Sequence, residues 1–149
     1  MEKELIPDPN NSFQKKRIGF QADIIVYVVG TSFDGRQEKL AQLYQDCTPD
    51  DTPACSLVRE PNNQYDSGAV AVHVIIGDVS TAIGYIPKNY EVPCRSTSGT
   101  FHYDGDNNIE RRPLWKIMDK RYGTIKVGLE GVWEVQSNYG ARVGIAHEM

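Results

Sequence analysis

Short apolar segments rich in β-branched residues, each ended by glycine, proline or Asn/Asp-rich turns, constrain this chain more than any other feature. Residues 69–76 are almost continuously apolar and predict a buried strand that ends at the turn Gly77-Asp78. The same pattern predicts strands at 18–30, with its centre at 24–29, at 55–60 and at 82–86. We therefore expect a mainly β protein.

The C-terminal region predicts a hairpin. Apolar residues alternate with charged ones, with Ile125, Val127, Leu129, Trp133 and Val135 on one parity and Lys126, Glu130 and Glu134 on the other. Gly131 is expected to bulge or bend this strand. The turn is expected at 137–140 and the returning strand at 141–145.

Two segments predict helices. Residues 36–44 are rich in helix formers, with Leu40, Leu43 and Tyr44 at helical spacing. Residues 109–122 are the second, with Pro113 tolerable only in its first turn. The stretch 87–108 is expected to be an extended surface loop. About six strands and two helices indicate a small curled antiparallel sheet or barrel.

Length and composition favour one ordinary globular domain. The chain has 149 residues, 40% hydrophobic and 24% charged, with a net charge of −4. This acidic balance argues against a strongly basic duplex binder but not against a local nucleic-acid patch. We expect a flexible arm at 1–17 and a single domain at 18–149. Without a leader or a long apolar run, we expect a cytoplasmic protein that contacts no membrane.

Catalytic and metal-binding motifs are sparse. The odd cysteine count fits a reducing compartment with free thiols. His73 reads as a core histidine, and the spacing of Cys94 and His102 is not that of a zinc site. As a nucleophilic pair, these two residues would have nothing to orient the histidine and no oxyanion hole. Phosphate-binding loops and nucleophile elbows are absent from the sequence, so we expect no cofactor, no metal and no enzyme.

The loop at 61–68 concentrates hydrogen-bonding side chains around one aromatic ring. Asn62, Asn63 and Asp66 can bond their own backbone and stiffen the turn. Either these residues only build the turn, or Tyr65 offers a stacking face and Asp66 a fixed acceptor.

Three blocks, in order along the chain, resemble the HIRAN domain family. They are Val-Val-Gly-Thr-Ser-Phe-Asp-Gly-Arg-Gln at 28–37, Arg-Glu-Pro-Asn-Asn-x-Tyr-Asp-x-x-Ala-Val-Ala-Val at 59–72, and Ile-Gly-Tyr-Ile-Pro-Lys at 83–88. The segment 138–143 is a weaker match to the last strand of the family. The insertion at about 92–112 lies outside the pattern.

The resemblance implies a small OB-like or SH3-like six-stranded antiparallel β-barrel with two short helices. The family occurs at the N-terminus of helicase-like fork remodelers, where it captures the 3′ end of single-stranded DNA, and in short free-standing bacterial proteins. This chain is similar to the free-standing type. The resemblance thus implies a non-catalytic DNA-binding domain in a repair or replication context, with a helicase or repair protein as a further partner.

Site residues follow from the same resemblance. Asp66 would accept a hydrogen bond from a free 3′-hydroxyl and repel a 3′-phosphate, while Tyr65 would stack on the terminal base. The other implied DNA-binding residues are Phe33 as a second stacking ring, Tyr85 as a pocket wall, Asn62 and Asn63 in the loop, and Arg36 and Lys88 at phosphates. Thr31 and Ser32 stand where the remodeler type has Arg and Tyr, and Asp34 adds repulsion, so weaker binding is expected.

Several alternatives stay open from the residues alone. Phe33, Tyr65 and Tyr85 could be packing at the barrel rim, and Arg59 and Glu60 could pair to close a strand end. The basic series is either a solvated helix face or an extension of a DNA groove; it comprises Arg111, Arg112, Lys116, Lys120 and Arg121. The main functional rival is a protein-interaction module that uses a barrel edge or the 92–112 loop. A small hydrolase or nuclease is the second.

Overall fold

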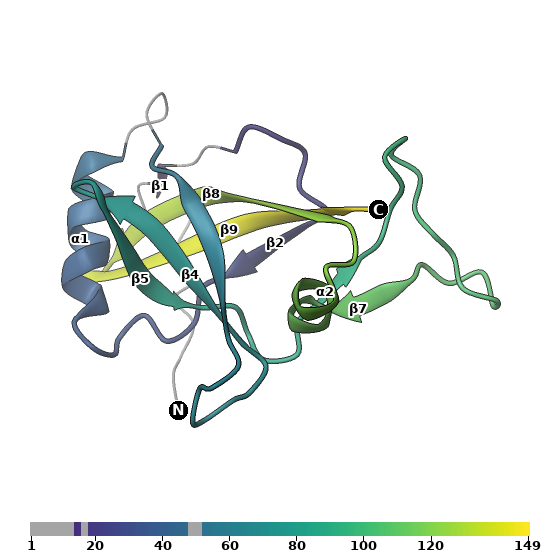
Figure 1. Ribbon diagram of the computed structural model, residues 1–149. Coiled ribbons are helices and arrows are strands. Elements are labelled where there is room, and N and C mark those ends of the chain that lie inside the picture. The colour runs from purple at the N-terminus through teal and green to yellow at the C-terminus, as the bar shows by residue number, and fades with distance from the viewer. Residues whose placement is uncertain (1–13, 16–17, 48–51) are drawn as a thin grey trace.

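The computed structural model describes residues 14–15, 18–47 and 52–149, and within them the protein is mainly β with two helices. The elements in chain order are β1 (Gln14–Lys15), β2 (Ile24–Tyr27), α1 (Arg36–Asp46), β3 (Cys55–Glu60), β4 (Ala69–Ile76), β5 (Val79–Tyr85), β6 (Glu91–Pro93), β7 (Arg111–Pro113), α2 (Leu114–Lys120), β8 (Thr124–Val135) and β9 (Asn138–Glu148). They form three antiparallel sheets, ordered β1-β8-β9-β2, β3-β4-β5 and β6-β7. Helix α1 lies at one end of the two larger sheets, and α2 lies with β7 at the other (Figure 1).

The long β8–β9 hairpin is the backbone of the first sheet. Its two-residue turn, Gln136 and Ser137, has positive φ at both positions, 50° and 65°. Such a turn matches the twist of the two strands, so pairing continues up to Val135 and Asn138. The turn expected at 137–140 is therefore wrong by a few residues.

A bulge interrupts the alternation along β8. The register against β9 shifts between Leu129 and Gly131, which confirms the expected irregularity at Gly131. The extra residue, Glu130, is only 5% exposed and is paired with Arg142. The expected parity thus fails at the bulge, because Glu130 points inward and Val132 and Trp133 are both buried.

Two strands of the second sheet agree closely with the sequence-based predictions. β3 and β4 have the predicted bounds, and β4 is buried along most of its length. This sheet meets the first one at Val29 and Tyr85, whose backbone N–H groups donate to each other's carbonyls at 2.9 and 2.8 Å. β3 lies beside β8 without a hydrogen-bonded ladder. Within the described residues none of the three sheets closes, so the expected six-stranded barrel is not confirmed.

Helix α1 covers the gap between the two larger sheets. Leu40 and Leu43 are buried against them, as the helical spacing predicts. Gln37 fixes the start of the helix: its Nε2 donates to the carbonyls of Thr31 (3.0 Å) and Tyr139 (2.8 Å), and its Oε1 accepts from the N–H of Tyr139 (2.7 Å).

The region 87–122 differs most from expectation. Instead of one irregular loop, β6 pairs with β7, and bridges join Arg95 to Phe101 and Tyr103 to Ile109. The chain between the two strands is therefore an arm with its own pairing. The second helix begins only at Leu114, because Pro113 is extended, with φ −55° and ψ 135°. Residues 109–113 complete the arm, contrary to the helix expected there.

Other expectations meet the structure only in part. Of the N-terminal arm expected at 1–17, only Gln14 and Lys15 belong to the described residues, and they pair with Trp133 and Val132. All three cysteines are free thiols. Neither helix of the described chain has the length and apolar character to cross a bilayer.

The close approach of the two larger sheets depends on Gly84. A Cβ at this position would lie 2.4 Å from the Val29 carbonyl oxygen and 2.5 Å from Val28 Cγ1. We predict that Gly84→Ala lowers the free energy of unfolding in urea by about 1–3 kcal/mol, the usual cost of overpacking. Gly105→Ala is the matched control, because nothing lies within 4 Å of its Cβ. Equal stability of the two variants would contradict this account of the junction.

Candidate functional site

A cleft of about 680 Å³ opens beside the junction of the two sheets. Three segments build its walls: the turn after β2, the loop between β3 and β4, and the segment that follows β5. Seven of the eight predicted site residues line it, namely Phe33, Arg36, Asn63, Tyr65, Asp66, Tyr85 and Lys88. Asn62 is exposed and does not line the cleft. Val29, Ala69 and Ile86, which belong to the recognised motifs, supply apolar lining that sequence reasoning missed.

The 61–68 loop is held by its own side chains. Asn63 Oδ1 accepts from the backbone N–H groups of Tyr65 (2.9 Å) and Asp66 (3.1 Å), and Asn63 Nδ2 donates to Glu60 Oε1 (3.1 Å). Such Asx turns replace backbone hydrogen bonds and tolerate few other loop shapes. The loop is therefore fixed without any contribution from the Tyr65 ring.

Asp66 has one oxygen engaged and one available. Its Oδ1 accepts from the backbone N–H of Gly68 at 2.9 Å, which closes the end of the loop. Within the described chain, Oδ2 has no hydrogen-bond partner, and the residue lines the cleft. A carboxylate oxygen in this position can accept a hydrogen bond from a ligand hydroxyl.

Phe33 and Tyr65 present aromatic rings to solvent at the cleft. Their exposed fractions are 54% and 86%, high values for large apolar side chains. Packing at a rim would have covered these rings, so that alternative does not describe Phe33 or Tyr65. Two exposed rings on a preformed cleft suit the stacking of flat ligand groups.

Arg36 is mainly a wall of the cleft. Its Nη1 donates to the Gly30 carbonyl at 2.6 Å, its guanidinium carbon lies 5.1 Å from the centre of the Tyr85 ring, and its side chain is 12% exposed. Asp34, at 3.5 Å, forms a long ion pair with it. Of the two residues expected at phosphates, Lys88 is the one with an exposed side chain.

Tyr85 also has a packing role, as the rim alternative supposed. Its hydroxyl donates to Glu60 Oε1 at 2.8 Å, so Glu60 holds both Tyr85 and Asn63. Burial raises the pKa of Tyr85, the hydrogen bond to Glu60 raises it further, and the neighbouring Arg36 lowers it. Apart from the place of Glu60 just before the loop, no signal in the sequence points to this role.

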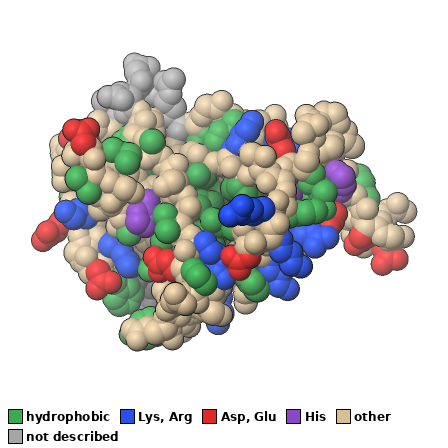
Figure 2. Space-filling model, viewed as in Figure 1, with side chains coloured by type: hydrophobic (Ala, Val, Ile, Leu, Met, Phe, Trp, Pro, Cys, Tyr) green, Lys and Arg blue, Asp and Glu red, His purple; other side chains and the backbone are tan. Residues whose placement is uncertain are grey.

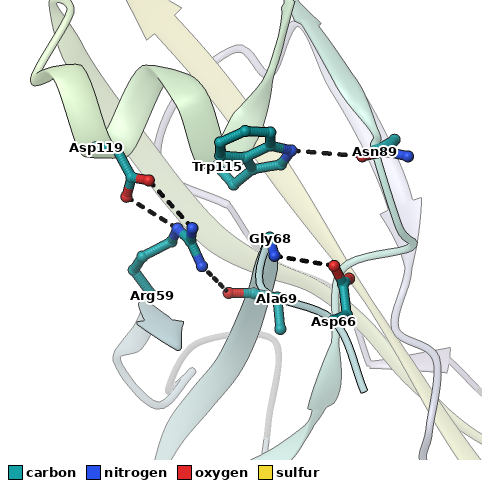
Figure 3. A network of polar contacts seen from close by, with 7 residues as sticks. All are labelled: Arg59, Asp66, Gly68, Ala69, Asn89, Trp115 and Asp119. Carbon is teal, nitrogen blue, oxygen red and sulfur yellow. Dashed lines mark hydrogen bonds and ion pairs between the residues drawn. The ribbon is translucent and has the colours of Figure 1, made fainter. Parts of the chain in front are cut away.

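Arg59 and Glu60 do not pair with each other, because neighbouring residues of a strand point to opposite faces. Arg59 instead forms two hydrogen bonds with Asp119 of α2, at 2.9 and 3.1 Å, and a third with the Ala69 carbonyl at 3.2 Å. Figure 3 shows this network together with Trp115, whose ring lies next to Gly68. Helix α2 is thus tied directly to the end of the Asp66 loop.

The cleft has little net charge. Arg36 and Lys88 stand against Asp34 and Asp66, so the site offers rings, an acceptor oxygen and a single exposed cation rather than a strong positive field. Shape and hydrogen bonding, not long-range attraction, would select its ligand.

The described histidines and cysteines do not form a recognisable reactive site. Burial, followed by the charge of Glu110, raises the pKa of the Cys94 thiol, the opposite of what an activated nucleophile requires. His73 is not in the core as expected: it is partly exposed beside Ser80, and His147 is the fully buried histidine. Among the described residues, no group of three or more potential ligands could hold a metal ion.

The comparisons with known proteins add no relative: no protein-family model, no curated protein and no solved structure matches this chain. The resemblance to the HIRAN family therefore rests on the three motif blocks themselves.

The two neighbouring asparagines allow a matched test of the loop. We predict that Asn63→Ala accelerates amide hydrogen exchange at Tyr65 and Asp66, because it removes the acceptor of both N–H groups. The free energy of unfolding of this variant should fall by about 1–3 kcal/mol, because three hydrogen bonds of roughly 1 kcal/mol each are lost. Asn62→Ala should change neither quantity. Unaltered exchange in Asn63→Ala would show that the loop is held in another way.

Proposed function

We propose that this protein is a HIRAN-like, non-catalytic module that binds the 3′-hydroxyl end of single-stranded DNA in the cleft. The observation that carries the proposal is the convergence of three separate motif blocks on one cleft. Residues 33, 63–66 and 85–88 are distant in sequence, and the motifs alone assign them a common role. Their meeting in one cleft supports that role.

Stacking would supply most of the affinity. Phe33 and Tyr65 expose their rings at the cleft, and each stacked base is worth roughly 1–3 kcal/mol regardless of its identity. The loop that carries Tyr65 is already fixed, so little conformational freedom would be lost on binding. We therefore expect binding without strong sequence preference.

Asp66 would select the chemical form of the strand end. Its Oδ2 would accept the hydrogen bond of a 3′-hydroxyl, while its negative charge would repel a 3′-phosphate. Lys88 would contact a backbone phosphate. With Arg36 committed to Gly30 and Tyr85, and Thr31 only 4% exposed, few groups remain to hold phosphates, and the affinity should be modest.

The proposal includes the fold. We take the two larger sheets as a partly open OB-like or SH3-like barrel, supported by the bridge between Val29 and Tyr85 and by the position of β3 beside β8. A cytoplasmic role in DNA repair or replication, alongside a helicase or repair protein, belongs to the same proposal.

The direct test is fluorescence anisotropy at low salt with a labelled single strand of about 10 nucleotides, a length within the footprint of such domains. We expect a strand with a 3′-hydroxyl to bind more tightly than the same strand with a 3′-phosphate, and duplex to bind least. No binding to any of them at high protein concentration would overturn the proposal and favour the protein-interaction module.

A tyrosine pair tests the stacking role. We predict that Tyr65→Ala weakens binding of the 3′-hydroxyl strand by roughly 5–150-fold, the equivalent of about 1–3 kcal/mol. Tyr103→Ala is the matched control, because Tyr103 is also exposed (58%) but lies on the arm between β6 and β7. Equal affinities of the two variants would exclude Tyr65 from the binding site.

Charge at position 66 can be removed without removing its loop contact. Asp66→Asn keeps an oxygen for the Gly68 N–H but loses the repulsion of a 3′-phosphate. We predict that the preference for hydroxyl over phosphate ends falls by about fivefold or more, since like charges in contact cost ~1 kcal/mol even in water. Asp106→Asn, on the arm, should leave the preference unchanged. If Asp66→Asn kept the full preference, another group would be reading the strand end.

A further inference from the structure

The segment that forms β7 and α2 has a charge opposite to that of the chain. Residues 111–121 carry five basic residues and one acidic residue, in a chain whose net charge is −4. We call Arg111, Arg112, Lys116, Lys120 and Arg121 the basic surface. Figure 2 shows Lys and Arg side chains gathered over the region of α2 and β7. Such a local concentration attracts polyanions even on an acidic protein.

Most of these cations are free to meet a ligand. The nearby carboxylates are already paired, Glu110 with Arg112 and Asp119 with Arg59. Within the described chain, Arg111, Lys116, Lys120 and Arg121 have no ion-pair partner, and all four are exposed. Lys116 and Lys120 are one turn apart and so share a face of α2.

The basic surface adjoins residues that neighbour the cleft lining in sequence. Trp115 makes these contacts: its ring abuts Gly68, so that a Cβ there would lie 3.0 Å away, and its Nε1 donates to Asn89 Oδ1 at 3.4 Å. Asn89 follows the cleft residue Lys88, and Lys116 Nζ lies 5.4 Å from the centre of the Trp115 ring. Figure 3 shows the Trp115 ring beside Gly68 at the end of the Asp66 loop, with its Nε1 directed toward Asn89. The ion pair of Arg59 with Asp119 fixes α2 in this place.

We propose that the basic surface is a phosphate-binding track for the part of the same single strand that lies 5′ of the end held in the cleft. The backbone would leave the cleft past Lys88 and cross α2 at Lys116 and Lys120. This inference rests on the proposed function, and it takes the basic series as a nucleic-acid groove rather than a solvated helix face. A positively charged track beside stacking rings is the usual construction of single-strand binding sites.

DNA strands of two lengths can distinguish binding at the track from binding at the cleft. A 3′-hydroxyl strand of about 4 nucleotides would fill the cleft alone, and one of about 12 would also reach the track. The test compares Lys116→Gln/Lys120→Gln with the control Lys39→Gln/Lys126→Gln, which removes two exposed lysines of α1 and β8 that line neither the cleft nor the basic surface. Glutamine preserves helix propensity at 116 and 120.

We expect the wild type to bind the long strand more tightly than the short one. The Lys116→Gln/Lys120→Gln variant should lose on the order of tenfold in affinity for the long strand at about 0.1 M salt, and the slope of log K against log[salt] should fall by about 1.4. Its affinity for the short strand should not change, and the control should resemble the wild type.

Other results overturn one proposal or both. If the wild type bound the two strands with equal affinity, or if both double variants lost the same affinity for the long strand, the phosphate-binding track would be contradicted. The proposed capture of the strand end would not be affected. If Lys116→Gln/Lys120→Gln lost affinity for the long strand while Tyr65→Ala had no effect, the track would be supported. Binding of the strand end in the cleft would be contradicted. If the protein bound neither strand but did bind an acidic polyglutamate peptide, both proposals would be overturned. The basic surface would then be assigned to a protein partner.

Discussion

The backbone bridge between Val29 and Tyr85 is the contact on which the candidate site depends. It joins two sheets that are otherwise separate ladders, and thereby places the turn after β2 against the segment after β5. The bridge requires a residue without a side chain at position 84, because any Cβ would meet the Val29 carbonyl. Arg36 then closes the corner by bonding Gly30 and covering the Tyr85 ring. The cleft is thus a consequence of how the sheets meet.

Hydrogen bonds between polar side chains and the backbone hold the loop at 61–68, which forms another wall of the cleft. Glu60 accepts hydrogen bonds from both Tyr85 and Asn63, and Asn63 in turn holds the backbone at Tyr65 and Asp66. This arrangement keeps the Tyr65 ring exposed at the cleft, where a ligand could reach it. A rigid loop that displays an aromatic ring and a carboxylate oxygen reduces the entropy lost on binding. Because Arg36 and Lys88 are balanced by Asp34 and Asp66, the cleft itself has little net charge, and under the proposal the long-range attraction of a DNA strand would come from the basic surface.

Local patterns predicted the parts of the fold that local sequence determines. The bounds of β3 and β4, helix α1 and the loop at 61–68 follow from β-branched runs, helical spacing and turn residues. The failures involve distant partners: pairing of β6 with β7 kept residues 109–113 out of the helix, and Arg142 drew Glu130 into the interior at the bulge. The ion pair between Arg59 and Asp119 joins residues 60 positions apart, which no periodicity reveals. Seven residues that line the cleft could be named from the motif blocks, whereas the contacts of Glu60 and Trp115 exist only in the folded chain.

Chemical-shift mapping of the isotope-labelled protein tests the central claim most directly. A 3′-hydroxyl strand of about 4 nucleotides, short enough to occupy the cleft alone, would be titrated while the backbone amides are observed. The account predicts saturable shifts confined to Gly30 and Phe33, the loop at 63–68 and the segment at 85–88, which together surround the cleft. Shifts that avoid these three segments, for example on the arm between β6 and β7, would contradict it.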